Sequence, residues 1–134
     1  MANAFYEKAA QKFGQGSLSW AATLKVALLK NDYVVDLVTH EFYSSITGAV
    51  GTNQTIANPA VLADGVFDGD DVVWTSLADP SEDVTQLVIY KDTGTPGTSS
   101  LILYIDTMSG LPFRPNGTDV NVTWDNGSDR IARL

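Results

Sequence analysis

Apolar residues in the last third of the chain follow the two-residue period of β-strands. In residues 84–91 (VTQLVIYK) and 101–105 (LILYI), both alternating sets of positions are apolar. Strands of this kind have both faces covered. We therefore predict two strands here, and we expect the extra cover on residues 84–106 to come from an N-terminal helix or a neighbouring subunit.

Residues 119–125 (DVNVTWD) show the other strand pattern, in which apolar and polar positions alternate. Val120, Val122 and Trp124 would face inward and the residues between them outward, so this strand is buried on one face only. The Asn126-Gly127 pair fits a two-residue primed turn that returns the chain into residues 130–134. Together these strands indicate an antiparallel sheet.

The N-terminal residues predict a short helix over Asn3–Phe13. Asn3 is a suitable N-cap, apolar residues recur at Phe5, Ala9 and Phe13, and Gly14 can end the helix in the left-handed conformation. A helix this short is unstable alone in water, so it packs on something. We favour its own sheet as that surface, and the alternative is an arm that packs on a neighbouring subunit.

The middle of the chain is less regular. Residues 23–30 (TLKVALLK) predict a strand, and the segment that follows contains a helical turn or two beginning at Thr39. Residues 48–63 are rich in Thr, Asn, Gly and Pro and predict a loop with one short strand. Two strands are expected around residues 66–76, with Asp68-Gly69 as a tight turn or bulge between them.

These elements predict a mainly β protein: an antiparallel β-sandwich with a short N-terminal helix and one further short helical segment. A length of 134 residues fits one domain. Within this single domain of residues 1–134, we expect residues 1–16 to form a helical arm and residues 17–134 a β-rich core.

Composition excludes several function classes. The chain has no cysteine, so it has neither disulfides nor thiol chemistry. Eight Lys and Arg stand against sixteen Asp and Glu, and the window from Asp64 to Asp83 holds seven acids and no basic residue. Nucleic-acid binding requires a basic stripe, which is lacking. No apolar run reaches the length of a membrane helix, and the N-terminal residues do not have the pattern of a secretory signal.

Candidate catalytic chemistry is sparse. His40 is the single histidine, and although Ser44 could share a helical face with it, a surface or packing role for His40 is favoured. The acids from Asp64 to Asp71 suggest calcium, but they lack the residue order of an EF-hand loop. We expect a protein that is not an enzyme and that uses no cofactor or metal.

The order of several segments resembles a family of small structural proteins of tailed bacteriophages, described as virion or head decoration proteins. The resemblance covers nearly the whole chain and is specific only as a set. It rests on ANAFYEKAAQKF, LKVALLKNDYVVDLVTHEF, ADGVFDGDDVVWT, LVIYKDTG and PNGTDVNVTWDNG.

The resemblance implies a structural protein of the virion, assembled in the host bacterial cytoplasm, and we expect it to decorate and cement the capsid. Its expected partners are the major capsid protein and further copies of itself, as a trimer. Two alternatives are a tail, collar or fibre-adaptor protein and a surface carbohydrate-binding module with an exposed Trp or Tyr. We expect partner contacts through the N-terminal helix, residues 39–43 and the loop at residues 48–59. The candidate contact residues are Phe5, Tyr6, Phe13, His40, Phe42, Tyr43 and Asn53.

Overall fold

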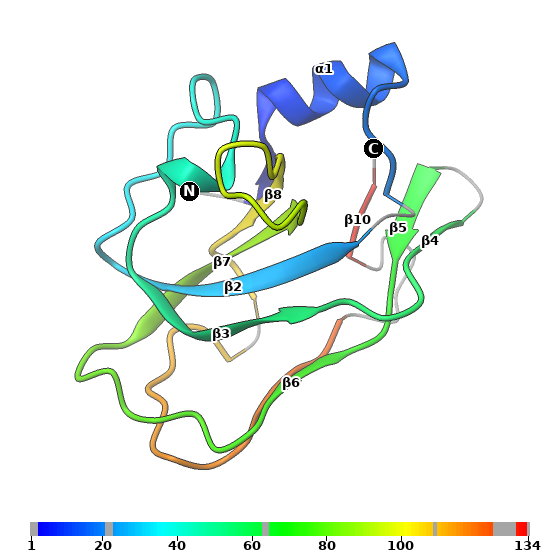
Figure 1. The fold of residues 1–134 in the computed structure, drawn as a ribbon. Helices are drawn as coiled ribbons and strands as arrows, with labels where there is room; N and C mark the ends of the chain where they lie inside the picture. Colours follow the sequence, from blue (N-terminus) through cyan, green and yellow to red (C-terminus); the bar gives the residue numbers. More distant parts are fainter. Residues whose placement is uncertain (1–2, 21–22, 63–64, 109, 125–130, 134) are drawn as a thin grey trace.

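The protein is mainly β, with antiparallel sheets and one helix near the N-terminus arranged in a sandwich-like fold (Figure 1). The structure, a computed structural model, describes residues 3–20, 23–62, 65–108, 110–124 and 131–133. In this part of the chain, the main sheet has the strand order β1-β8-β7-β2-β3, and two smaller sheets have the orders β10-β5-β4 and β6-β9. The predicted fold class is confirmed. The elements are β1 (Ala4–Phe5), α1 (Glu7–Gln15), β2 (Leu24–Lys30), the 3-10 helix η1 (Tyr43–Ser45), β3 (Ala49–Thr55), β4 (Ala60–Leu62), β5 (Val66–Asp68), β6 (Val72–Trp74), β7 (Val84–Lys91), β8 (Leu101–Ile105), β9 (Val120–Val122) and β10 (Ala132–Arg133).

Strand β7 lies at the centre of the main sheet. It pairs antiparallel with β2 on one side and with β8 on the other. Every residue of β8 is buried, and so are six of the eight residues of β7. The prediction that residues 84–91 and 101–105 are covered on both faces is therefore confirmed.

The cover on one face of β7 comes from the segment 31–45. Gln86 of β7 donates to the main-chain oxygen of Tyr33 at 2.8 Å, and the ring of Tyr90 stacks on that of Tyr43. On the other face of β7, Leu87 and residues of β9 line the groove described below. The segment 31–45 thus covers one face of β7 and α1 contacts β8, where we expected the cover to come from the helix or a neighbouring subunit.

Strand β9 has the predicted one-sided pattern. Val122 and Trp124 are buried, whereas Asn121 and Thr123 are exposed. The expected hairpin is wrong, however, because β9 pairs with β6 and β10 pairs with β5 in a different sheet. The Asn126-Gly127 turn lies outside the described residues.

The N-terminal helix begins and ends later than predicted. Asn3 does not cap it: its side chain instead accepts from the N–H groups of Asp106 and Thr107, beside the edge strand β1. The helix begins at Glu7, and Gly16 rather than Gly14 takes the left-handed conformation, with φ 75°. Strand β1 pairs with β8 and α1 also contacts β8, so residues 4–15 pack on their own domain as favoured.

The segment 48–63 contains two strands, where one was predicted. Strand β3 pairs with β2 and forms one edge of the main sheet, and β4 pairs with β5 in the small sheet. Polar, glycine-rich sequence of this kind has a weak intrinsic preference for strands. Here, pairing with the apolar strand β2 places residues 49–55 in a strand. The expected loop is a pair of edge strands.

Strands β5 and β6 flank Asp68-Gly69 as predicted, but they belong to different sheets. Gly69 is needed for packing, because a Cβ atom at this position would overlap Cγ2 of Ile56. Since glycine has no Cβ atom, the backbone can pass close to the buried Ile56 side chain where the chain crosses from β5 to β6.

The second helical segment is the 3-10 helix η1, which begins at Tyr43 and not at Thr39. Its N-cap position is Phe42, with no side-chain cap, so Thr39 does not have the predicted capping role.

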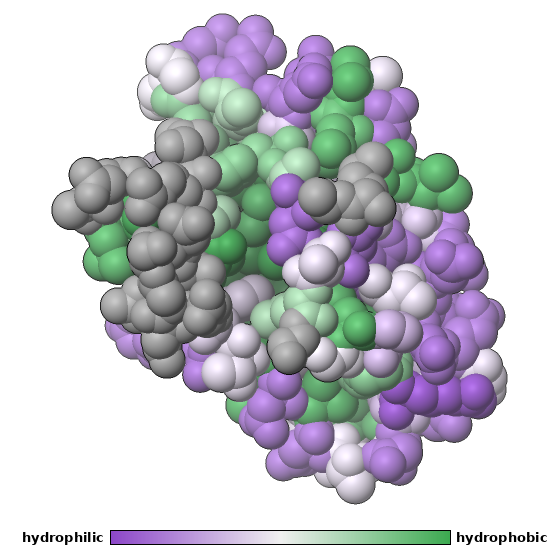
Figure 2. All heavy atoms as spheres, turned by 180° about the vertical axis from the view of Figure 1, so that it is seen from behind, coloured by the Kyte–Doolittle hydropathy of each residue, from purple (hydrophilic) through white to green (hydrophobic). Residues whose placement is uncertain are grey.

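The surface opposite to the view of Figure 1 shows apolar side chains in separate patches among polar ones (Figure 2). Among the described residues, no helix is long and apolar enough to cross a membrane.

Candidate functional site

Two of the predicted contact residues, Phe5 and Phe13, belong to an aromatic cluster inside the domain. The ring of Phe67 in β5 lies 5.7 Å from that of Phe5 and 5.4 Å from that of Phe13, and it stacks on Trp20 at 4.5 Å. Such aromatic pairs add to the free energy of burial. The cluster therefore joins β1 and α1 to the small sheet, and both phenylalanines remain only half-buried.

Two more candidates, Tyr6 and His40, are linked through Tyr33. The hydroxyl oxygens of Tyr6 and Tyr33 lie 2.7 Å apart, and the Tyr33 hydroxyl lies 2.8 Å from Nδ1 of His40. The N–H of Asp36 also donates to this Nδ1. We infer that Nδ1 is the acceptor, so the chain of donation runs from Tyr6 through Tyr33 to His40.

Tyr6 and Tyr33, the two tyrosines that are hydrogen-bonded in series to His40, are held in the neutral form. Burial raises the pKa of Tyr6 far above its ordinary value, and it also raises the pKa of Tyr33. Tyr6 is fully buried, with no exposed surface. Its predicted role in direct partner contact is therefore wrong for this fold, because the side chain anchors the core.

The loop that follows Tyr33 is fixed by Asp36 and presents two valines. The Asp36 carboxylate accepts from the N–H groups of Val38 and Thr39, at 3.0 and 3.1 Å. Hydrogen bonds from Thr39 and then Val38 hold the pKa of Asp36 below its ordinary value. Val34 is 80% exposed and Val38 is 56% exposed. The loop thus displays apolar surface on an ordered backbone.

Phe42 is connected to the helix by Lys12. The Lys12 ammonium lies 2.8 Å from the Glu41 carboxylate, 3.0 Å from Oγ of Ser100 and 4.4 Å from the centre of the Phe42 ring. A cation over an aromatic face is attracted to it. These contacts join α1 to the segment around Phe42.

Tyr43 and Asn53 are brought together against Tyr90. The rings of Tyr43 and Tyr90 stack with centres 4.4 Å apart, and Nδ2 of Asn53 donates to both hydroxyls at 2.8 Å. Within the described structure, the buried Oδ1 of Asn53 has no hydrogen-bond partner. This contact links η1 to the edge strand β3.

The seven predicted residues thus form four separate groups and not one site. Six of them retain partial exposure, and Tyr6 does not. Each group connects segments that are distant in sequence. Their main role in the structure is to hold the N-terminal elements and the segment 31–45 on the main sheet.

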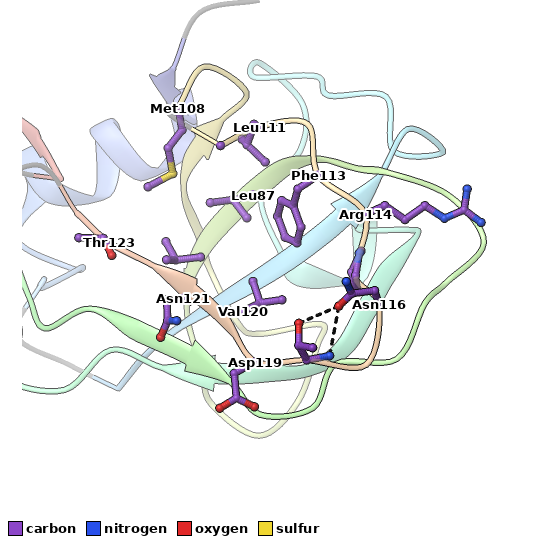
Figure 3. A pocket seen from close by; sticks show the side chains of 14 residues that line it. Leu87, Met108, Leu111, Phe113, Arg114, Asn116, Asp119, Val120, Asn121 and Thr123 are labelled. Atoms are coloured by element: carbon purple, nitrogen blue, oxygen red, sulfur yellow. Dashed lines mark hydrogen bonds between the residues drawn. The ribbon is translucent and has the colours of Figure 1, made fainter.

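A groove of about 320 Å³ lies on the β9 side of the main sheet (Figure 3). Leu87, Phe113 and Val120 provide an apolar surface, and polar side chains line the rim. Two of the rim side chains have partners within the fold: Asn116 accepts from Thr118, and Asp119 accepts from the N–H of Ser76. The groove therefore offers apolar contact beside polar side chains that are held by bonds within the fold.

The acidic stretch that suggested calcium has structural contacts. Asp71 accepts from the N–H of Trp124 at 2.9 Å, and Asp70 accepts from the side-chain amide of Asn58 at 2.7 Å. In the described part of the chain, no three or more His, Asp or Glu side chains are grouped as metal ligands. These carboxylates act as hydrogen-bond acceptors for neighbouring segments.

Sequence reasoning missed the exposed apolar residues at strand positions. Val61 is 53% exposed and Leu62 is 39% exposed on the edge strand β4, and Val73 of β6 is 44% exposed. One signal was present for β4: no charged residue occurs between Glu41 and Asp64 in a chain of net charge −8. Charged residues are depleted at the centre of protein–protein interfaces, so an uncharged run in a charged chain indicates a candidate contact segment.

Comparison with known proteins does not assign the chain to a family. No protein-family model matches it, and no curated protein matches it.

Proposed function

We propose that the protein is a non-enzymatic structural component of a tailed-bacteriophage particle, most specifically a capsid decoration (cement) protein. The observation that carries the proposal is the use of its polar side chains. His40, Asn53 and Lys12 all hold segments of the fold together. The surface meanwhile presents apolar residues on a fixed loop and on the edge strand β4. This combination is suited to contact with other proteins.

The resemblance to phage structural proteins supports the same class. Four of its five segments contain the strands β2, β5, β6 and β9 and part of β7, and the first contains β1 and most of α1. The similarity therefore covers much of the scaffold of the domain, and its second segment also includes the loop with Val34 and Val38. The residues that contact partners in this proposal lie mostly between or beside these elements, on the loop with Val34 and Val38.

In the proposed mechanism, the protein binds the outside of the head and bridges neighbouring copies of the major capsid protein. Each contact can be weak, because many copies on a repeating shell act together and raise the effective concentration. Bridging of this kind opposes the pressure of the packaged genome. A trimer at a symmetry axis of the shell remains the proposed oligomer of the bound protein.

The first alternative, a tail, collar or fibre-adaptor protein, differs from a decoration protein in the number of copies per particle.

The carbohydrate-binding alternative relied on an exposed Trp or Tyr. Trp20, Trp74 and Trp124 are 1%, 2% and 4% exposed, so no tryptophan offers a ring face to a sugar. Tyr43 is the tyrosine that keeps partial exposure, so the carbohydrate-binding alternative now rests on this ring.

Quantitative mass spectrometry of purified particles tests the proposal. A decoration protein is present at hundreds of copies per particle, whereas a few to a few dozen copies would favour the tail or collar role, and absence would overturn both. For the contact surface, Val34→Lys and Val38→Lys should reduce occupancy of the particle. Val73→Lys, at a valine on the separate β6-β9 sheet, serves as the matched control.

A further inference from the structure

Strand β4 is the outer strand of the small sheet, beside β5 and on the side away from β10 (Figure 1). It keeps a regular antiparallel register with β5: Ala60 pairs with Asp68, Val61 with Phe67 and Leu62 with Val66. Two consecutive residues of β4, Val61 and Leu62, are exposed apolar residues. An exposed edge strand is a template for another strand.

The backbone of Val61 points to the open side of β4. The carbonyl oxygen of Phe67 accepts from the N–H of Ile131 at 3.1 Å, so the backbone groups of Phe67 are directed to β10. In an antiparallel pair, two opposite residues either exchange both hydrogen bonds or direct both sets of groups away from each other. Val61 is the residue opposite Phe67, so its N–H and carbonyl groups are directed away from β5.

The two outer strands of the main sheet are less available. Strand β1 has only two residues, and the side chain of Asn3 bonds to the backbone next to it. Strand β3 carries an irregularity in its pairing with β2, has Gly51 at φ 71°, and covers its Thr52 carbonyl with the side chain of Gln54. Such bulges and short strands hinder pairing with another chain.

The charge distribution allows a second copy to approach β4. The chain has a net charge of −8, but β4 lies in the uncharged run between Glu41 and Asp64. If two β4 strands were adjacent, the two β5 strands with their acids would be about 14 Å apart, at roughly 4.8 Å per strand. This distance exceeds the screening length of about 8 Å at physiological ionic strength.

We propose that two copies of the protein pair antiparallel through β4, with Val61 of each copy opposite Val61 of the other. The pair has two-fold symmetry, so the same surface is complementary to itself. The N–H and carbonyl groups of the two valines exchange two hydrogen bonds, and the β-branched side chains meet on one face. Pro59 has no N–H to donate, which limits the pairing to a short stretch.

This association is weak in dilute solution. Three residues per strand bury much less than the roughly 1,200 Å² of a stable interface. We expect a dissociation constant on the order of 0.1–1 mM, and pairing becomes effective when many copies are held close together. Because like charges are the main opposing force, added salt strengthens the association. An interface based on ion pairs would respond to salt in the opposite direction.

Single-cysteine variants test the geometry directly, since the chain has no cysteine of its own. Opposite residues in a hydrogen-bonded pair have Cα atoms about 5.5 Å apart, which is within the range of a disulfide. Val61→Cys should form a covalent dimer under mild oxidation at least about tenfold faster than Val73→Cys, a control of similar exposure. Equal rates would overturn the proposal.

The unmodified protein provides a second measurement. The Val61 amide should be protected from hydrogen exchange more strongly as the protein concentration rises, and sedimentation should show a two-copy species that Val61→Lys removes. An amide that exchanges rapidly at every concentration overturns the proposal, and so does protection seen only after particles are added. Both measurements use purified protein, so the pairing can fail while the decoration role stands.

Discussion

The hydroxyl of Tyr104 donates to Oε1 of Gln86 at 2.6 Å, in the covered interior of the main sheet. Nε2 of the same glutamine donates to the carbonyl oxygens of Lys30 and Tyr33, both at 2.8 Å. Burial, as the first cause, raises the pKa of Tyr104 to about 12, so its hydroxyl stays protonated as a donor. Gln86 thus joins β7, β8 and the end of β2.

Replacement of Gln86 by Leu should be strongly destabilising. It removes three hydrogen bonds and leaves buried polar groups unpaired, at about 1–3 kcal/mol for each unsatisfied group. We expect the free energy of unfolding to fall by more than about 2 kcal/mol in urea titrations. Gln54→Leu is the matched control, because the Gln54 side chain donates to the exposed Thr52 carbonyl, and it should change the value by less than about 0.5 kcal/mol. Similar effects of the two changes would contradict this role of Gln86.

The link from Tyr6 to His40 predicts an order of stability between two conservative variants. Tyr33→Phe leaves the buried Tyr6 hydroxyl without a partner, at about 1–3 kcal/mol. Tyr6→Phe removes its own hydroxyl and keeps the bond from Tyr33 to His40, so it should cost only about 1 kcal/mol. The double variant should be less destabilised than the sum of the two. Additive effects in thermal or urea unfolding would argue against a shared network.

Two glycines of the N-terminal helix should respond to Ala in opposite directions. Gly14 lies within α1, with open space around a Cβ atom and no positive φ, so Gly14→Ala should stabilise the protein by about 0.5–1 kcal/mol. Gly16 ends the helix at φ 75°, and Gly16→Ala should destabilise it by about 1–2 kcal/mol. If both changes have the same sign in urea unfolding, the helix does not end at Gly16.

Stability should fall in acid partly through Asp92. The N–H of Gly94 and then the ammonium of Lys25 hold the pKa of Asp92 below its ordinary value. Because the folded-state pKa is the lower one, the contribution is fully present above the unfolded-state value of about 3.9 and is lost as pH falls through the folded-state value. Asp92→Asn should therefore be destabilising at pH 6 but nearly neutral at the lowest pH at which the protein stays folded.

Lys25→Met provides the control for this pH dependence. It removes the ammonium and leaves the hydrogen bond from Gly94, so it should reduce the pH dependence of unfolding less than Asp92→Asn does. An equal reduction by the two changes would assign the shift to the ion pair with Lys25 and contradict the role of the Gly94 hydrogen bond.

The strands that sequence reasoning placed well are those whose pattern is local. Residues 84–91 and 101–105 are apolar on both faces, and Val120 to Trp124 alternate, so burial alone determines their structure. Asn3 shows the limit of this reasoning. An asparagine next to an apolar run fits a helix cap equally well, but its partners, Asp106 and Thr107, are brought near only by the fold.

The candidate site was less predictable for the same reason. Asn53 and Tyr43 were both selected, yet their connection passes through Tyr90, and nothing in the sequence indicates that this ring lies between them. Tyr6 was selected as an aromatic residue of a helix face, but it precedes the helix and its hydroxyl finds Tyr33 inside the core. Residue type indicated the capacity for contact, and only the tertiary structure determined the partner.

The placement of β1 beside β8 also sets the order of events when the chain is made. Ala4 pairs with Tyr104, so β1 lacks this neighbouring strand until residues 101–105 have been synthesised. Strand β5 likewise pairs with β10 through Phe67 and Ala132. Such distant pairings place the folding time in the range of milliseconds to seconds. These sheets are therefore completed only after residues 101–105 and 132–133 have been synthesised, and Phe5 of β1 remains exposed to chaperones and to other nascent chains until then.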